Sequence, residues 1–295
     1  MSDTESTAQI TASYGRRYTV RTPGGATLDA TTRRKRTDYA CGDFVRITRL
    51  GGNQAVIEEY LPRSSLLYRQ DAFKSKLIAA NATLLLIVTA AVPGPSETLL
   101  QRSLVAAEAA GIRAIILLNK ADLPETAGLA ATLEPYRQMG YPLLAVSALT
   151  GHESLADSLN PVLRGQTAVL LGQSGMGKST LTNALLGRNA ARTGEISDAL
   201  DSGRHTTTHA QMYELDNGAK LIDSPGLQEF GLHHLDAPTL LACFPDLRHL
   251  AGACRFHNCT HRAEPGCALK AAAETGEIRK ERLAFLQKIT GELLR

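Results

Sequence analysis

A glycine-rich segment that ends in lysine and serine has the clearest chemistry in the sequence. Residues 172–179 read Gly-Gln-Ser-Gly-Met-Gly-Lys-Ser, between the apolar run 168–171 and a helical pattern. Glycines let backbone amides close around phosphate oxygens, and the following helix N-terminus adds a favourable dipole. Lys178 is expected to neutralise the β- and γ-phosphates, and Ser179 to coordinate Mg²⁺. The segment predicts a nucleotide phosphate site; a plain glycine-rich turn is a poor alternative, because the Lys-Ser pair has the required flanks.

A second polar segment, directly after an apolar run, resembles the guanine-reading motif of GTPases; it reads Asn119-Lys120-Ala121-Asp122. The Asp122 carboxylate can accept from both N–H donors on the Watson–Crick edge of guanine, whereas adenine would leave this charge unpaired, which is costly. The asparagine is expected to hold the loop and the base, and the lysine stem to cover the ring. Ser147 and Ala148 follow the run 143–146, where GTPases place an amide on the guanine oxygen.

Two further segments offer groups for Mg²⁺ and the γ-phosphate. Asp223 ends an apolar run and is expected to bind Mg²⁺ through water, and the amide of Gly226 to bond the γ-phosphate. Upstream, residues 203–208 read Gly-Arg-His-Thr-Thr-Thr. In GTPases such a threonine senses the γ-phosphate and the segment loosens after hydrolysis. We predict Thr208 as the magnesium ligand, although the sequence alone leaves its two neighbours open. Each segment alone would pass for an ordinary loop.

The complete set of predicted nucleotide-binding residues combines these five segments. Its members are Asn119, Lys120, Asp122, Ser147, Ala148, Gly172, Gln173, Ser174, Gly175, Met176, Gly177, Lys178, Ser179, Thr180, Thr207, Thr208, Asp223 and Gly226, of which Ser179 and Thr208 are the predicted magnesium ligands.

The elements that must position these groups alternate between strands and helices from residue 69 to 230. Continuous aliphatic runs, separated by helical patterns such as 97–110 and 125–139, predict a mostly parallel sheet covered on both faces. Most GTPases place the phosphate loop before the base reader, but here the base reader comes first. This order indicates a circular permutation, with residues 151–165 joining the former chain ends.

Two more regions flank this α/β domain. Residues 16–68 carry short strand-like runs with tight turns, which predict a small all-β barrel or sandwich, and residues 1–15 are polar and predicted to be disordered. The basic run 33–36 lies in the barrel region, where it is either a solvated face or a nucleic-acid contact. Residues 231–295 are predicted to form a metal-binding module that ends in an amphipathic helix near 277–290.

Cysteine usage predicts a zinc site in that last region. The chain has 5 cysteines, and without an N-terminal export signal we expect a reducing cytoplasm, where disulfides are rare. Cys254, Cys259 and Cys267 lie close together with histidines between them, a donor set that suits tetrahedral Zn²⁺. The alternative is a group of reduced thiols in a small core, which so dense a cluster disfavours. A short module without a large hydrophobic core needs a bound metal ion or a similar cross-link for stability.

With permuted motif order, a barrel in front and a Cys/His module behind, the chain resembles the RsgA (YjeQ) family over nearly its whole length. These bacterial GTPases act in late maturation of the small ribosomal subunit. The resemblance implies that the barrel is an OB-fold, that the subunit stimulates hydrolysis, and that His261, not His257, completes a structural zinc site of one ion per chain. It also implies a catalytic role for His205, because the family shows a histidine there and the position after Gly226, which carries a glutamine in many GTPases, is Leu227.

We therefore expect a cytoplasmic GTPase, a monomer without a membrane segment, that uses Mg²⁺ with GTP and binds the small ribosomal subunit and its rRNA. Further basic residues of the last region suit rRNA contact; they are Arg255, Arg262, Lys270, Arg279, Lys280 and Arg282. Two alternatives stay open at this point. One is a phosphotransferase that uses the same loop on a small molecule, which the base reader and the threonine segment disfavour. The other is a zinc-scaffolded RNA-binding protein with a vestigial nucleotide site.

Overall fold

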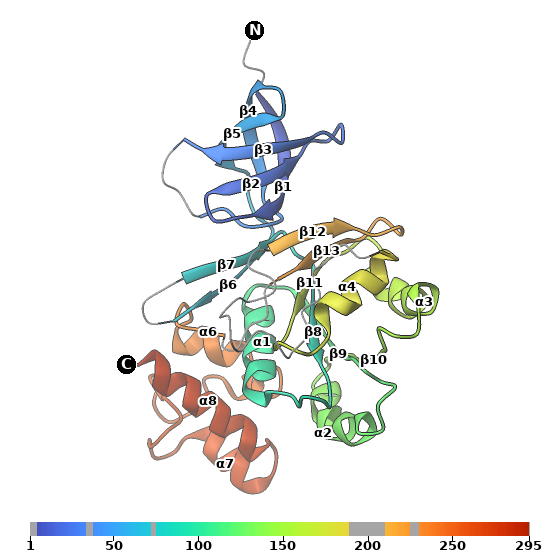
Figure 1. Ribbon diagram of the computed structural model, residues 1–295. Helices are drawn as coiled ribbons and strands as arrows, with labels where there is room; N and C mark the ends of the chain where they lie inside the picture. Colours follow the sequence, from blue (N-terminus) through green and yellow to red (C-terminus); the bar gives the residue numbers. More distant parts are fainter. Residues whose placement is uncertain (1–4, 34–37, 72–74, 189–209, 225–229, 295) are drawn as a thin grey trace, which may run out of the picture.

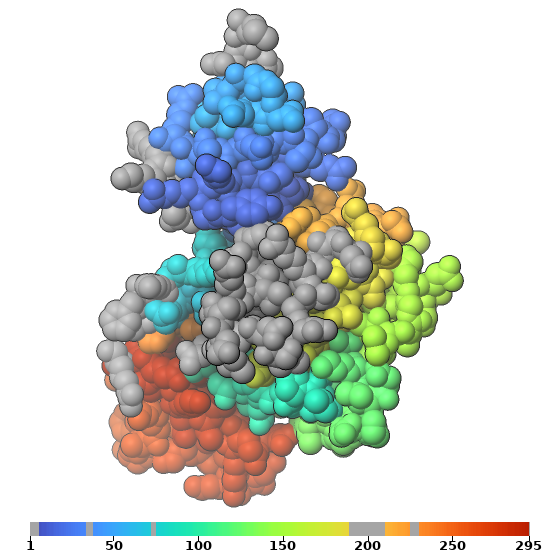
Figure 2. Space-filling view, viewed as in Figure 1, coloured from blue at the N-terminus to red at the C-terminus, as the bar shows by residue number. Residues whose placement is uncertain are grey.

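The computed structural model of the protein describes residues 5–33, 38–71, 75–188, 210–224 and 230–294. A barrel at one end, a central α/β region and a helical module at the other end follow one another along the molecule (Figure 1). The space-filling view shows the barrel and the C-terminal helices at opposite ends, with the central region between them (Figure 2). Within the described residues, none of the helices combines the length and apolar character that crossing a bilayer needs.

Five strands close the N-terminal barrel. They are β1 (Glu5–Ser13), β2 (Arg17–Arg21), β3 (Thr27–Thr32), β4 (Phe44–Gly51) and β5 (Gln54–Tyr60). The sheet runs β1-β2-β3-β5-β4 and closes through an antiparallel β4–β1 pairing, as expected of an OB-fold. Alternate side chains point inward, so that Ile10, Val20 and Ile57 lie buried in one core. The predicted barrel is confirmed.

The predicted disordered tail is wrong, because β1 occupies most of it. Ala8, Ile10 and Ala12 are buried, which is the period-two pattern of a strand with one face in a core. The small size of two of these residues and the polar residues between them hide this pattern in the sequence. The barrel therefore begins at Glu5 and not at residue 16.

A two-stranded hairpin, β6 (Leu66–Gln70) and β7 (Ser75–Ala80), leads from the barrel into the α/β region. The predicted boundary between residues 68 and 69 lies inside β6. The hairpin contacts the barrel where the amide of Ala80 donates to the carbonyl of Cys41 at 2.9 Å. Gly42 lies so close to this hairpin that a Cβ there would be 2.1 Å from the carbonyl oxygen of Ala80.

The central sheet has the predicted parallel core. Its order is β10-β9-β8-β11-β13-β12, parallel except for β12. The strands are β8 (Leu84–Thr89), β9 (Arg113–Leu118), β10 (Leu143–Ala145), β11 (Thr167–Leu171), β12 (Ala210–Glu214) and β13 (Lys220–Asp223). In β8, Leu85 and Ile87 belong to the core on one face, whereas Leu84 and Leu86 belong to the core on the other.

Two pairs of helices cover the two faces. They are α1 (Glu97–Ala109) and α2 (Thr126–Gln138) on one face, and α3 (His152–Leu163) and α4 (Lys178–Leu186) on the other. The connection predicted to join the former chain ends thus contains a helix, α3. Leu155, Leu159 and Leu163 of α3 recur every four residues and are buried, which packs this helix against the sheet.

Strand β12 joins the central sheet to the barrel. It pairs antiparallel with β13 on one side and with β1 on the other, where Ala12 and Ser13 face Gln211 and Ala210. Arg21 of β2 forms an ion pair with Glu214 of β12 beside this junction. The barrel and the central sheet therefore form one continuous eleven-stranded sheet.

The C-terminal module is helical, as predicted. Its elements are α6 (Ala237–Ala242), the 3-10 helix η1 (Arg248–Leu250), α7 (Ala268–Thr275) and α8 (Lys280–Leu293). The predicted final helix corresponds to α8. Apolar side chains of α6, α7 and α8 share one hydrophobic cluster with α1, so that the module is packed on the central region.

Candidate nucleotide site and metal centre

The phosphate loop turns sharply between β11 and α4. The backbone of Gly172 passes so close to β8 that a Cβ there would lie 2.3 Å from the carbonyl oxygen of Val88. Gly177 has a φ of 89° at the N-cap of α4, a conformation that glycine adopts without strain. The first turn of α4 begins at Lys178 and contains Ser179 and Thr180. The loop amides and the N-terminus of α4 are thus available for an anion.

The Lys178 side chain is folded into the loop. Its Nζ donates to the carbonyl oxygens of Gly172 and Gln173, both at 2.9 Å. Burial lowers the pKa of Lys178 to about 8, an effect that the nearby Asp223 partly opposes. Burial also raises the pKa of Asp223, at the end of β13, to about 6, and Lys178 opposes this shift in turn. Burial thus disfavours the charged form of both groups. A bound phosphate would stabilise the Lys178 ammonium, and its magnesium ion would stabilise the Asp223 carboxylate.

The base-reading segment is bonded directly to the phosphate loop. The Nδ2 of Asn119 donates to the carbonyl oxygen of Met176 at 2.9 Å, and the asparagine is 1% exposed. Its Oδ1 is buried and has no hydrogen-bond partner among the described residues. A Cβ on Gly177 would lie 2.4 Å from the Asn119 Nδ2. Two segments far apart in the sequence thus form one site, with little space between them.

The Asp122 carboxylate is oriented by the segment after β10. The Oγ of Ser147 donates to the Asp122 Oδ1 at 2.5 Å and accepts from the amide of Leu149 at 3.2 Å. Lys120 has a φ of 58°, and its Nζ donates to the carbonyl oxygen of Val92 at 2.9 Å. The lysine side chain therefore reaches from the base-reading segment to the chain that follows β8.

Most predicted nucleotide residues come together here, while some lie outside the described part of the chain. Gln173, Ser174, Gly175 and Met176 belong to the phosphate loop, and Ala148 follows Ser147. His205, Thr207, Thr208 and Gly226 lie outside the described residues, so that their positions stay predictions. The carbonyl acceptors of Val92 and Met176 were not predicted, because backbone groups leave no mark in the residue type. For Ser147 the sequence predicted a contact between the backbone amide and guanine. The hydrogen bond from its hydroxyl to Asp122 was not predicted, although a serine at this position could have suggested it.

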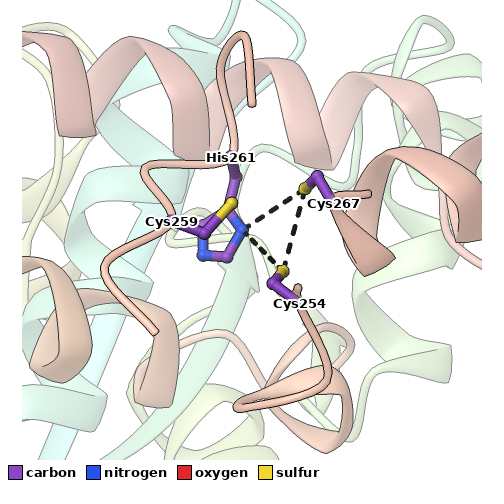
Figure 3. A group of neighbouring side chains, drawn as sticks. All are labelled: Cys254, Cys259, His261 and Cys267. Atoms are coloured by element: carbon purple, nitrogen blue, oxygen red, sulfur yellow. Dashed lines mark hydrogen bonds between the residues drawn. The ribbon is translucent and has the colours of Figure 1, made fainter. Parts of the chain in front are cut away.

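The four predicted metal ligands converge in one cluster (Figure 3). They are Cys254, Cys259, His261 and Cys267, and their ligand atoms all lie within 4.8 Å of one another. The Nδ1 of His261 is 3.5 Å from the sulfurs of both Cys254 and Cys267, which are 3.9 Å apart. A tetrahedral zinc with Zn–S of about 2.3 Å and Zn–N of about 2.0 Å requires S–S and S–N separations of about 3.8 and 3.5 Å. The donor set therefore fits a zinc ion.

Neighbouring groups hold the loop that carries these ligands. The Glu264 carboxylate accepts from the amide and hydroxyl of Thr260 and from two further amides, and these hydrogen bonds hold its pKa at about 2. The Nε2 of Gln287, in α8, donates to the carbonyl of His261 at 2.5 Å. Cys267 is the N-cap of α7. The cluster thus links the loop to both terminal helices.

Comparison with known proteins extends these observations over the whole chain. A model of the RsgA GTPase family matches residues 60–233. The small ribosomal subunit biogenesis GTPase RsgA of Neisseria gonorrhoeae (strain NCCP11945) is 69% identical over 288 residues, which cover 98% of this chain and 92% of that protein. The protein of the same name from Nitrosomonas europaea is 48% identical over 290 residues, 97% of this chain and 91% of that protein.

Among solved structures, YjeQ from Thermotoga maritima superposes with a TM-score of 0.70 at 26% identity and covers 99% of both chains. YloQ, described as a circularly permuted GTPase, superposes with a TM-score of 0.69 at 25% identity, over 99% of this chain and 96% of that chain. The order of the phosphate loop and the base reader agrees with this permutation. The chain therefore belongs to the RsgA GTPase family and is a circularly permuted GTPase.

Proposed function

We propose that the chain hydrolyses GTP to GDP and phosphate on the small ribosomal subunit during its late maturation, and that the subunit stimulates the reaction. The observation that carries the GTP site is the hydrogen bond from Asn119 to the Met176 carbonyl, because it joins the base reader to the phosphate loop. The ribosomal part rests on the names of the RsgA relatives in Neisseria and Nitrosomonas. Family membership does not favour the phosphotransferase alternative.

Each side chain at this site has a role in the proposal. Asp122 selects guanine, the Lys178 ammonium turns from the loop carbonyls to the β- and γ-phosphates, and Ser179, Thr208 and Asp223 hold the magnesium ion. That ion would neutralise charge that develops on the phosphates. Burial supports these roles for Lys178 and Asp223, since each is an ionisable group in a dry site that a ligand of opposite charge would stabilise.

His205 is proposed to orient the attacking water when the subunit is bound. A neutral imidazole can accept a hydrogen bond from water and direct it at the γ-phosphorus. His205→Ala should keep the affinity for GTP and for the subunit and lose most of the subunit-stimulated rate, measured as phosphate release. Stimulation that survives this change would assign the role to another group, including one from RNA.

The Cys254, Cys259, His261 and Cys267 cluster is proposed to hold one structural zinc ion per chain. Four protein donors complete a tetrahedron and leave no position for a reacting water. The position of Cys267 at the start of α7 supports a structural role, because the ion would fix the loop against the two last helices. Metal analysis of the purified protein should give one zinc per chain.

Basic residues at both ends of the molecule support rRNA contact. Arg16, Arg17 and Arg49 are exposed on the barrel, whereas Arg33 and Arg46 form ion pairs with Glu58 and Glu59. Arg255, Arg262, Arg279 and Lys280 are exposed on the C-terminal module. Arg282 does not belong to this group: it is 3% exposed and pairs with Asp246. The prediction that Arg282 contacts rRNA is therefore wrong. A cytoplasmic monomer remains part of the proposal.

Phosphate release from GTP, measured with and without purified small subunits, tests the function. We expect slow intrinsic hydrolysis and a marked increase with subunits. Hydrolysis that stays the same when subunits are added would contradict the ribosomal role. Transfer of the phosphate to a small-molecule acceptor would favour the phosphotransferase alternative, and nucleotide binding without turnover would indicate a vestigial site.

A further inference from the structure

Phe230 and Gly231, a few residues after the Asp223–Gly226 motif in the sequence, are anchored by their backbone. Phe230 is fully buried, with 0% exposure, and its carbonyl accepts from the Nη1 of Arg102, in α1, at 3.1 Å. The next carbonyl, that of Gly231, accepts from the amide of Gln70 in the hairpin at 3.0 Å. A Cβ at Gly231 would lie 2.3 Å from the carbonyl oxygen of Gln70, so that only glycine suits this approach.

The same arginine holds the last helix of the protein. The Nη2 of Arg102 donates to both carboxylate oxygens of Glu292, in α8, at 2.7 and 2.6 Å. The two side chains are 12% and 30% exposed. Charge-assisted hydrogen bonds of this kind are stronger than neutral ones, and partial burial limits their screening by salt. One guanidinium group thus joins α1, the carbonyl of Phe230 and α8.

The upstream end of the same motif is held by a different part of the protein. Asp223 ends β13, which lies between β11 and β12 in the central sheet. The Oγ of Ser224 donates to the carbonyl of Leu170 in β11 at 2.7 Å. The sheet therefore fixes the start of the motif, whereas Arg102 and the hairpin fix the chain beyond its end.

We propose that Arg102 is a positioning residue for GTP hydrolysis, which holds the chain at Phe230 in register with the γ-phosphate and makes this hold depend on Glu292 of the C-terminal helix. The proposal rests on the proposed role of Asp223–Gly226 at the γ-phosphate. The hydrogen bonds of Arg102 within the described residues reach Phe230 and Glu292 and not the phosphate loop. Its loss should therefore change the rate of the bound complex, while the affinity for nucleotide, set by the phosphate loop and Asp122, stays the same.

A neighbouring contact provides a matched control. Gln101, also in α1, accepts from the Nη1 of Arg282 in α8 at 2.7 Å. This hydrogen bond ties the same two helices together at a buried position, but it does not reach Phe230. Gln101→Met removes it and leaves Arg102 in place, so that a general effect of loosening the module can be separated from an effect on Phe230.

The test uses the full-length zinc-containing protein and compares Arg102→Met, Arg102→Lys, Glu292→Gln and Gln101→Met. GTP turnover is measured at saturating substrate, together with KM for GTP, Kd for GDP, zinc content and Tm. Arg102→Met should lower kcat at least about tenfold, because small misplacements of groups at a reacting centre cost this much or more. KM and the Kd for GDP should be unchanged. Arg102→Lys and Glu292→Gln should lie between this variant and the wild type, and Gln101→Met should keep the wild-type kcat.

Normal kcat in Arg102→Met would overturn the proposal, and so would an equal loss of kcat in Gln101→Met, since that would make module docking the cause. If Arg102→Met does not fold, Glu292→Gln carries the test: a wild-type kcat there would overturn the dependence on α8. Asp223→Asn separates this inference from the proposed function. If Asp223→Asn retains full turnover, the γ-phosphate site is wrong; if it loses turnover while Arg102→Met does not, only the inference about Arg102 fails.

Discussion

Gly177→Ala is expected to weaken nucleotide binding strongly through two effects that the structure locates. The residue has a φ of 89°, and a Cβ there would lie 2.4 Å from the Asn119 Nδ2. Alanine at such a φ costs about 1–2 kcal/mol. The added methyl group also displaces Asn119 from its 2.9 Å hydrogen bond to the Met176 carbonyl, and a bond of this kind contributes about 1 kcal/mol.

The sum is about 2–3 kcal/mol, and it should appear in affinity more than in stability. In the nucleotide-free protein the loop can shift, which removes the backbone strain at residue 177 and the clash with Asn119. Bound phosphates require the original loop conformation, so that both costs return when the nucleotide binds. Since 1.4 kcal/mol corresponds to a factor of ten, the Kd for GDP should rise roughly 30- to 150-fold. Titration with a fluorescent GDP analogue measures this change directly.

Gly187→Ala is the matched control at the other end of α4. Gly187 also has a positive φ, 61°, and a Cβ there would meet the His152 ring at 3.4 Å, away from Asn119. This variant should lose about 1 kcal/mol of stability, seen as a lower Tm, and keep the wild-type Kd. An unchanged Kd in Gly177→Ala, or an equal rise in both variants, would refute the steric reasoning.

Three further changes test the base reader, the metal centre and the buried carboxyl group. Asp122→Asn exchanges an acceptor for a donor, so that the affinity for GTP should fall and xanthosine triphosphate should be preferred; wild-type affinity for GTP would place the base reader elsewhere. Cys259→Ser should lose zinc and lower the Tm of the C-terminal module while GDP still binds, and a variant with full zinc content would contradict a four-ligand site. Burial raises the pKa of Asp223 from 3.8 to about 6, so that in this range the folded, nucleotide-free protein holds a proton that the unfolded chain has lost. The contribution of Asp223 to the free energy of unfolding should therefore decrease as pH rises from about 4 to about 6. Urea denaturation across this range should show a smaller pH dependence in Asp223→Asn, and an identical dependence would contradict the assignment.

The sequence predicts the central domain well because its motifs directly follow buried strands. Aliphatic runs such as Leu84–Thr89 are apolar on both faces, as a strand between two helical layers must be, and the phosphate loop follows β11. Strand β12 was missed for the opposite reason: Ala210–Glu214 is only half-buried and has no apolar run. Its backbone pairing with β1 and β13 determines that it is a strand, and pairing between distant segments is not visible in a local pattern.

In the candidate site, too, residue types were predictable from the sequence, whereas contacts between distant segments were not. The residue types and spacing predict the four side chains that converge in the candidate metal centre and the polar groups of the candidate nucleotide site, because this chemistry requires those types. Contacts such as Arg102 with Glu292, or Arg282 with Asp246, join segments that are separated in the chain. In the sequence both arginines are ordinary charges, so that Arg282 was assigned to the surface although it is buried.

The junction of β1 with β12 has a consequence for solubility and for any attempt to isolate the GTPase region. In the absence of β1, the antiparallel strand β12 would end the central sheet with unpaired amides and carbonyls, and such open edges promote aggregation. Within the described residues, the barrel protects this edge with two facing residue pairs, and the charged pair Arg21–Glu214 lies beside them. Removal of the barrel would therefore take away more than the proposed RNA-binding surface, because it would uncover a template for edge-to-edge association between copies of the chain.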